Sequence, residues 1–443
     1  MQKRAHIFSP SRTILLSMIL TIFVGTLALS LPCARLVEIP IIDLFFTATS
    51  CTCVTGLLTI PIESFSNFGL WIIMFLMQIG GLGLVTLSLF VVSLFVNLGL
   101  ATQVVAGEML DLESWKDARR IILFIIGMTF VFESIGALLI FFAIKDLYPL
   151  STSLFYSVFH AISAFCNAGI TLFPNSMVSF AGNPLMLIAV SALMFMGGFG
   201  FISWKEIFKR IQNSFNQRRA QLSLQTRIVL QYYGVFTFCN TILFWILERS
   251  NTLVSMNIPM QWLNSLFMAV TCRSGGYLNV YPHDLQNASI LTILFNAFIG
   301  AAPGSTGSGI KLTTTALIFA VIYSVIMNKH SVEIKGRKIM TDQIYRSLSI
   351  VMLSLLWIAA TTFILLISER GSSFMDILFE TISAFSTLGA SIGITDSLSN
   401  FGKLIISLTM LVGRIGVISL LLAISTRKEQ ADYSYPEERI MIT

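Results

Sequence analysis

Four short segments of the chain end in glycine and recur at a nearly constant spacing. ISAFCNAG ends at Gly169 and ISAFSTLG ends at Gly389, while looser relatives end at Gly56 and Gly276. The glycines lie about 110 residues apart, which indicates an internal fourfold repeat. Glycine permits a positive φ, so successive carbonyl oxygens can face one axis. A ring of such carbonyls can replace the hydration shell of a monovalent cation.

The segments contain no Asp or Glu, the residues that divalent sites usually recruit. They therefore predict a carbonyl filter for a monovalent cation, without a resident metal. An alternative interpretation is that the glycines only allow close helix packing. The predicted filter residues are Cys53, Val54, Thr55 and Gly56; Cys166, Asn167, Ala168 and Gly169; Arg273, Ser274, Gly275 and Gly276; and Ser386, Thr387, Leu388 and Gly389.

A second set of small-residue elements follows each glycine segment at a similar distance. They are GGLG from Gly80, GGFG from Gly197, GAAPG from Gly300 and GRIG from Gly413. Because they lie within long apolar stretches, close helix packing is an equally good interpretation for the first two. Their recurrence supports the fourfold repeat independently of the first set.

The composition indicates that these segments lie in a membrane. Of the 443 residues, 55% are hydrophobic and 11% are charged, and the mean hydropathy is +0.82. Soluble domains carry about 25% charged residues. The net charge of +6 does not indicate nucleic-acid binding, because basic residues on an apolar chain usually mark cytoplasmic loops. The six cysteines form no CxxC pair, so neither a disulfide framework nor a zinc site is predicted.

Eight apolar stretches are long enough to span a bilayer. Most Lys and Arg residues lie in the terminal and even-numbered connections, which predicts that both termini are cytoplasmic and that the protein lies in the cell membrane. The odd-numbered connections each contain a short apolar run before the glycine, interpreted as a re-entrant pore helix. The stretches are 13–34, 69–97, 121–144, 185–204, 228–247, 288–327, 348–367 and 404–425.

The predicted fold is therefore an all-α integral membrane protein with four tandem units of span, pore helix and span around a single central pore. The expected divisions are a cytoplasmic N-terminus (1–12), repeat 1 (13–100), repeat 2 (118–210), repeat 3 (227–328), repeat 4 (342–425) and a cytoplasmic tail (426–443).

The sixth stretch is too long to be one helix. Forty residues would reach about 60 Å, twice the ~30 Å hydrocarbon core. Its glycine-rich and proline-containing middle cannot hold a helix, and non-helical backbone at membrane depth is tolerated where it lines a cavity. We expect this segment to lie in the pore below the filter; a cytoplasmic linker is the alternative. The predicted gate comprises Gly300, Ala301, Ala302, Pro303, Gly304, Ser305, Thr306, Gly307, Ser308, Gly309 and Lys311, together with Arg414.

Five further side chains need an explanation. Arg414 lies in the eighth stretch and must face water or a partner; it would repel cations and attract the loop carbonyls, or form a structural ion pair. Arg273 and Glu380 are predicted to form a buried pair that braces neighbouring repeats. Glu133 needs a partner that the sequence does not name, and His160 is interpreted as a hydrogen-bonded packing residue.

Several motifs resemble one known family: SAFxxxG at two filters, TCRSGGY at 271–277, PGSTGSGIK at 303–311 and GRIG at 413–416. Over essentially its whole length the chain resembles the Trk/Ktr/HKT superfamily of potassium transporters. Because no extra N-terminal pair of spans is expected, it is most similar to the KtrB branch, with a TrkH-like subunit as the alternative. Cys53, Cys166, Cys272 and the sequence SGGY depart from the usual pattern near the filters.

The resemblance implies a channel-like potassium uptake protein. It implies K⁺ as the permeant ion, Na⁺ as a possible activator and no tightly bound cofactor. The implied partners are a second copy of the chain, with one pore per subunit, and a cytosolic ring of RCK-type nucleotide-binding subunits. Arg414 would act with the broken loop as a gate.

Other function classes fit the sequence less well. A membrane enzyme is not expected, because no paired carboxylates, HExxH or GxSxG occur. A secondary transporter with inverted repeats would place its repeats in alternating orientation, whereas these four run the same way. A sodium or ammonium pathway of the same fold is the nearest alternative. Within the resemblance, glycine rather than serine at Gly56 favours potassium.

Overall fold

The computed structural model describes residues 10–82, 115–215 and 221–424, and this part of the chain is mostly helical. Its only strands are β1 (Glu333–Ile334) and β2 (Arg337–Lys338), an antiparallel hairpin in which Glu333 lies opposite Lys338. The predicted C-terminal tail (426–443), residues 1–9 of the predicted N-terminus (1–12) and the second half of the stretch 69–97 lie outside the described residues, whereas residues 10–12 belong to the first helix.

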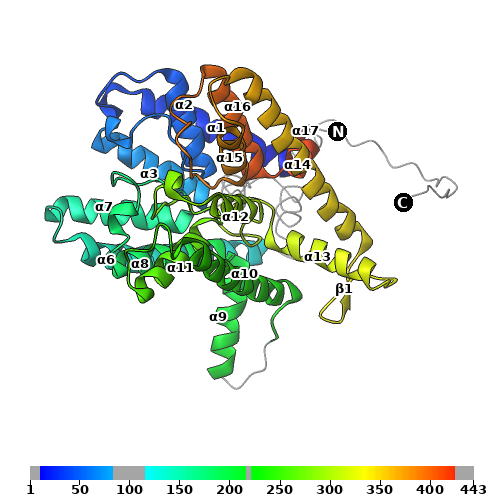
Figure 1. Cartoon of the computed structure of the whole chain (residues 1–443). Coiled ribbons are helices and arrows are strands. Elements are labelled where there is room, and N and C mark those ends of the chain that lie inside the picture. Colours follow the sequence, from blue (N-terminus) through cyan, green and yellow to red (C-terminus); the bar gives the residue numbers. More distant parts are fainter. Residues whose placement is uncertain (1–9, 83–114, 216–220, 425–443) are drawn as a thin grey trace.

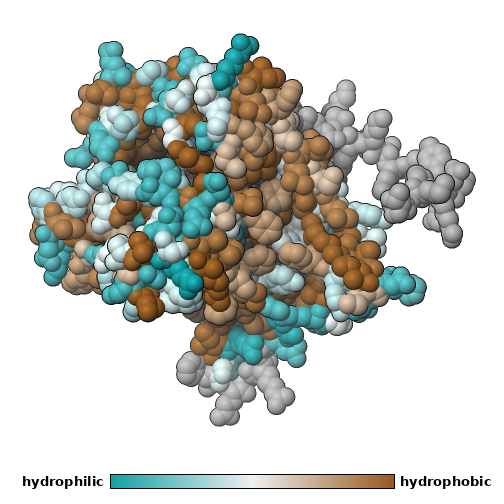
Figure 2. All heavy atoms as spheres, viewed as in Figure 1, coloured by the Kyte–Doolittle hydropathy of each residue, from teal (hydrophilic) through white to brown (hydrophobic). Residues whose placement is uncertain are grey.

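Four of the described helices are long and apolar enough to cross a membrane. They are α1 (Pro10–Ser30), α6 (Trp115–Ile144), α10 (Leu224–Glu248) and α14 (Thr341–Ser368). A fifth candidate is the pair α8 (Pro184–Gly198) and α9 (Phe201–Phe215), which is bent by 97°. Large apolar side chains cover much of the exterior (Figure 2). These surfaces are suited to lipid rather than water.

Each long helix is followed by a short helix and then by a second apolar helix. The short helices are α2 (Ile41–Cys53), α7 (Leu150–Cys166), α11 (Ile258–Thr271) and α15 (Phe374–Ser386). The second helices are α3 (Asn67–Gly81), α8, α12 (Asn287–Phe298) with α13 (Leu312–Ile326), and α16 (Asn400–Ile415) with α17 (Val417–Ile424). Single 3₁₀ turns occur at Pro32–Ala34, Ile62–Ser64, Val178–Phe180 and Pro282–Asp284.

The four units lie around a common centre, and the first and fourth are neighbours (Figure 1). Helix α3 contacts α7, α8 contacts α11, α12 contacts α15, and α16 contacts α2. The chain thus closes a ring on itself, with each short helix inside it.

In each unit, polar groups at the start of the second helix form hydrogen bonds with the end of the long first helix or with the turn that follows it. Ser66 caps α3 and donates a hydrogen bond of 2.5 Å to Cys33 O, and Asn183 caps α8 and donates one of 3.3 Å to Ala143 O. In the other two units a carboxylate replaces the backbone acceptor. Gln286 N donates to Glu248, and Ser399 N and Oγ donate to Glu369. These contacts fix the spacing of the helices that surround each short helix.

The glycines of the second helices allow these helices to approach the short ones closely. A Cβ at Gly80, Gly197 or Gly413 would collide with the carbonyl oxygen of Thr52, Phe165 or Phe385, respectively. Each carbonyl belongs to the last turn of the short helix in the same unit. The close-packing interpretation therefore accounts for these three glycines, whereas Gly300 faces Ser308 O in its own loop.

Two predicted spans are less regular than expected. The stretch 185–204 turns sharply between Gly198 and Phe201, where Gly200 has a φ of 96°. The stretch 404–425 is interrupted at Gly416, with a φ of 88°. Glycine accepts these angles without steric penalty. The sixth stretch breaks between Phe298 and Leu312.

Candidate ion-conduction site

The four glycine-terminated segments share one backbone conformation. The residue two positions before each glycine adopts a left-handed conformation and ends the short helix or its last turn: Val54 (φ 56°), Asn167 (59°), Ser274 (77°) and Thr387 (49°). The glycines also have positive φ: Gly56 (97°), Gly169 (68°), Gly276 (72°) and Gly389 (87°). A residue with a Cβ is strained at such angles by about 1–2 kcal/mol. This strain favours glycine at the last position without requiring it, because a residue with a side chain adopts a positive φ two positions earlier in each segment.

Each of these glycines packs against the backbone of the next unit. A Cβ would meet the carbonyl oxygen of the residue that precedes the neighbouring glycine. The pairs are Gly56 with Ala168 O, Gly169 with Gly275 O, Gly276 with Leu388 O and Gly389 with Thr55 O. Because the fourth segment contacts the first, the four segments form a closed ring of backbone at the centre of the molecule.

Hydroxyl groups in the last turns of the short helices hold these segments in place. Ser50 Oγ accepts from Gly56 N at 3.0 Å. Ser163 and Ser383, at the position equivalent to Ser50, donate to the residue after the glycine, Ile170 O at 2.7 Å and Ala390 O at 2.6 Å. Thr271, one residue further along its segment, donates to Tyr277 O at 2.8 Å. Sequence analysis missed this set, although Ser163 and Ser383 stand at the same place in the repeated SAF motif.

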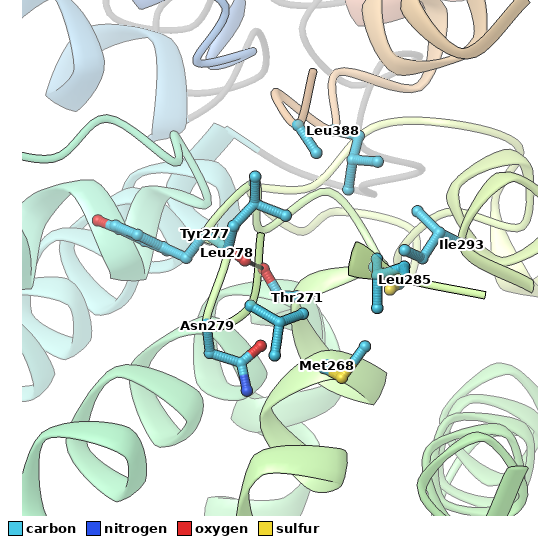
Figure 3. Close-up of a pocket in the computed structure, with 12 residues that line it drawn as sticks. Met268, Thr271, Tyr277, Leu278, Asn279, Leu285, Ile293 and Leu388 are labelled. Atoms are coloured by element: carbon cyan, nitrogen blue, oxygen red, sulfur yellow. Dashed lines mark hydrogen bonds between the residues drawn. The ribbon is translucent and has the colours of Figure 1, made fainter. Parts of the chain in front are cut away.

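The third segment is further anchored to the second unit. In Figure 3 Thr271 lies beneath the segment and Tyr277 points away from the small pocket beside it, while Leu388 approaches from the fourth unit. The Tyr277 hydroxyl donates a hydrogen bond of 3.3 Å to Ile170 O. The buried Tyr277 side chain thus joins the third segment to the second.

The loop between α12 and α13 contacts the glycine-terminated segments directly. Thr306 Oγ1 donates to Phe165 O at 3.1 Å and accepts from Asn167 Nδ2 at 2.7 Å. Ser308 N donates to Ser274 Oγ at 3.3 Å. Ala302 N and Thr306 N bond to the carbonyls of Gly198 and Gly197, each at 3.1 Å. The loop is therefore fixed to the ends of two segments and to the end of α8.

Arg414 connects this loop to two further units. Its Nη1 donates to Thr306 O and, at 3.0 Å, to Ser308 Oγ; its Nη2 donates to Gly80 O. The side chain is buried. The guanidinium thus joins α16, the broken loop and α3. Lys311 Nζ donates to Gly307 O at 2.7 Å within the loop.

The predicted pair of Arg273 and Glu380 is wrong. Arg273 lies 4.6 Å from the ring centre of Tyr233 and donates to Tyr233 O at 3.4 Å. Glu380 accepts from Ser391 at 2.8 Å and from Thr395 at 2.5 Å. The arginine side chain extends toward α10, while the hydroxyls that follow Gly389 satisfy the carboxylate. Among the described residues the two form no ion pair.

A buried ion pair occurs elsewhere. Lys403 Nζ lies 2.6 Å from Asp43 Oδ1, and both side chains are buried. The pair joins α16 to α2, across the interface that closes the ring. Sequence analysis did not predict this pair, because residues 360 positions apart give no local signal.

Glu133 and His160 each have a hydrogen-bond partner in the structure. Glu133 accepts from Gln78 Nε2 at 3.2 Å, and Gln78 Oε1 lies 3.8 Å from the Cys166 thiol. His160 accepts from Leu172 N at 3.1 Å and stacks on Phe173 with ring centres 4.1 Å apart. His160 is a packing residue, as expected.

The described residues offer backbone oxygens rather than a side-chain metal centre. Within residues 10–82, 115–215 and 221–424, no group of three or more His, Cys, Asp or Glu could hold a metal ion. Backbone carbonyl oxygens, such as those that lie against the four glycines, are of the kind that can coordinate a monovalent cation.

Comparison with known proteins gives consistent matches. Residues 11–435 match the family described as TrkH, cation transport protein. The Ktr system potassium uptake protein B of Vibrio alginolyticus is 34% identical over 97% of this chain and 94% of that protein. The potassium/sodium uptake protein NtpJ of Enterococcus hirae is 32% identical over 90% of this chain and 89% of that protein.

The fold is also found among solved structures. The potassium transporter TrkH of Vibrio parahaemolyticus superposes with a TM-score of 0.72 over 93% of this chain and 84% of that one, at 15% identity. That identity supports a shared fold alone. Together with the long apolar helices, the matches identify a multi-pass membrane protein, and the chain belongs to the TrkH family of cation transport proteins.

Proposed function

We propose that this protein takes up potassium across the cytoplasmic membrane through a single pore at the centre of its four units. One observation carries the proposal: four glycines with positive φ form a closed ring, each against a carbonyl oxygen of the next segment. Carbonyl ligands suit a dehydrated monovalent cation. Relatives over nearly the whole chain are named potassium uptake proteins.

The proposed architecture has eight spans and four re-entrant pore helices, with both termini in the cytoplasm. Helices α2, α7, α11 and α15 are the pore helices, and their carbonyl ends place partial negative charge beside the filter. The ring of contacts between neighbouring units supports this assignment. Non-helical backbone after each pore helix is shielded from lipid inside the ring, as a membrane interior requires.

The loop Gly300–Gly309, Lys311 and Arg414 form the proposed gate. Hydrogen bonds that the loop accepts from Asn167 and donates to Ser274 support a place directly beside the filter. A fixed guanidinium there repels permeating cations. Release of the loop would require the bonds to Arg414, Gly197 and Gly198 to break.

The proposed assembly is a homodimer on a cytosolic ring of RCK-type nucleotide-binding subunits. Its support is similarity to two proteins that are each named as a potassium uptake component of a Ktr system. We propose K⁺ as the permeant ion and Na⁺ as an activator, with no tightly bound cofactor. A sodium pathway is the second candidate, favoured by the similarity to a protein named for potassium and sodium uptake.

Growth of a bacterium that lacks potassium uptake tests the proposal. Expression of the chain should restore growth at low external potassium, more strongly with a co-expressed ring subunit. Uptake of rubidium and of sodium should be measured in the same cells. Sodium uptake without rubidium uptake would select the second candidate, and uptake of neither ion would contradict both.

A further inference from the structure

Helix α9 has a sharply divided surface that the proposed pore does not use. Trp204, Ile207, Phe208 and Ile211 lie on one side, at the spacing of one helical face. Lys205, Lys209 and Arg210 lie on the other side with Gln212 and Asn213. The division between the two faces is typical of a helix that lies in a membrane interface.

The first half of α9 packs against α6 and the end of α8, whereas large apolar side chains of its second half are exposed. Trp204 contacts Phe132 and Phe199, and the rings of Phe208 and Phe124 lie 6.1 Å apart. Even so, Phe208 is 40% exposed and Ile211 is 48% exposed. The helix extends away from the body in Figure 1. Its apolar stripe therefore continues beyond the contacts that α6 provides.

The orientation of α9 places this stripe near a membrane surface. Helix α8 has 15 residues and reaches about 22 Å, less than the ~30 Å hydrocarbon core. The bend of 97° then directs α9 across the axis of α8. If α8 crosses the bilayer from the outside, α9 begins a few ångströms above the inner headgroups and runs roughly parallel to them.

We propose that α9 binds the cytoplasmic surface of the membrane, with its apolar stripe in the acyl boundary and Lys205, Lys209 and Arg210 on anionic phospholipid headgroups. Charge supports a lipid surface: the helix carries these three cations, and its one acid, Glu206, accepts from Ser223 N at 3.0 Å. Cations on an amphipathic helix attract anionic headgroups. The inference rests on the orientation proposed above.

This contact is coupled to the proposed gate. Phe201 N donates a hydrogen bond of 2.8 Å to Gly304 O, so the first residue of α9 holds the broken loop. A Cβ at the preceding Gly200 would approach Pro303 O at 2.7 Å. Anionic lipid that fixes α9 therefore also restrains the loop, and lipid composition should alter flux.

A fluorescent label at position 211 tests the contact without relying on transport. The full chain with Cys33→Ser, Cys239→Ser and Ile211→Cys is labelled with bimane and reconstituted in phosphatidylcholine vesicles containing phosphatidylglycerol. Either lipid is supplied with brominated acyl chains, which quench on contact. We expect quenching by both lipids, with a preference for brominated phosphatidylglycerol.

Charge removal measures the headgroup contribution. The variant Lys205→Gln/Lys209→Gln/Arg210→Gln should lose the phosphatidylglycerol preference, by up to roughly fivefold per residue. The single variant Lys209→Gln should lose part of it if the triple variant does not fold. The matched control Lys335→Gln/Arg337→Gln/Lys338→Gln removes the same charge from the exposed β1–β2 hairpin and should keep the full preference.

Three results would overturn the inference: no quenching by either lipid, an unchanged preference in the α9 variants, or equal loss in the hairpin control. If neither lipid quenches the label but its fluorescence changes when a cytosolic ring subunit is added, α9 would instead be a helix that docks a protein. Potassium flux in the same vesicles reports on the proposed function separately.

Discussion

The side-chain amide of Asn167 donates a hydrogen bond of 2.7 Å to the hydroxyl of Thr306. It links the left-handed residue of one filter segment to the middle of the loop between α12 and α13. Any movement of the loop must break this bond or move the segment. The loop and this glycine-terminated segment are therefore expected to move together.

Replacing Gly56 or Gly389 by serine should weaken discrimination of potassium from sodium. A Cβ at either position would collide with Ala168 O or Thr55 O and would occupy a positive φ at a penalty of about 1–2 kcal/mol. Competition of sodium with rubidium uptake measures the effect. Gly182→Ser is the control, because a Cβ there meets nothing within 4 Å. Unchanged selectivity in all four ring glycine variants would remove the filter assignment.

Deleting Ala302–Gly309 should raise flux and loosen control by nucleotide. The deletion removes the contacts of Thr306 and Ser308 with the filter segments and with Arg414. Rubidium uptake at equal surface expression, with and without the ring subunit, is the measurement. A folded deletion variant with lower flux would indicate that the loop serves structure or conduction.

Arg414→Ala should conduct faster than Arg414→Lys, and wild type should be slowest. Lysine keeps the charge but cannot donate to Thr306, Ser308 and Gly80 together. The membrane potential supplies ~2.3 kcal/mol per charge per 100 mV, so local repulsion of that size is a substantial barrier. Maximal uptake decides the order, with the exposed Arg346→Ala as control. A folded but slower alanine variant would contradict it.

Lys403→Met should strongly destabilise the protein, by about 3–5 kcal/mol, because it leaves Asp43 buried without its partner. The double variant Asp43→Asn/Lys403→Met should recover much of the loss, since neither buried charge remains. Thermal unfolding of the purified protein in detergent gives the comparison. Additive losses in the double variant would show that the pair makes no net contribution.

Arg273→Met and Glu380→Gln should act independently. Arg273 contacts Tyr233, whereas Glu380 binds Ser391 and Thr395. A double-mutant cycle on thermal stability should therefore give a coupling energy within about 0.5 kcal/mol of zero. A coupling of several kcal/mol would restore the ion pair that the sequence suggested.

The sequence by itself determined the membrane class, the repeat and the ring glycines of this protein. The membrane class follows from local composition, because hydropathy decides which segments can lie in lipid. The repeat and its glycines follow from periodic spacing, because each glycine lies where the backbone has a positive φ. The break in the sixth stretch is local too, because glycine and proline disfavour the interior of a helix.

Tertiary structure alone decided which polar groups meet. Arg273 and Glu380 looked like partners because both are charged, buried and near a filter, yet each is satisfied by groups closer to it. Asp43 and Lys403 meet because α2 and α16 close the ring, and the bend after Gly198 brings Phe201 N to Gly304 O of the loop. A buried charge takes whichever partner the packing brings within reach, and no local pattern encodes that packing.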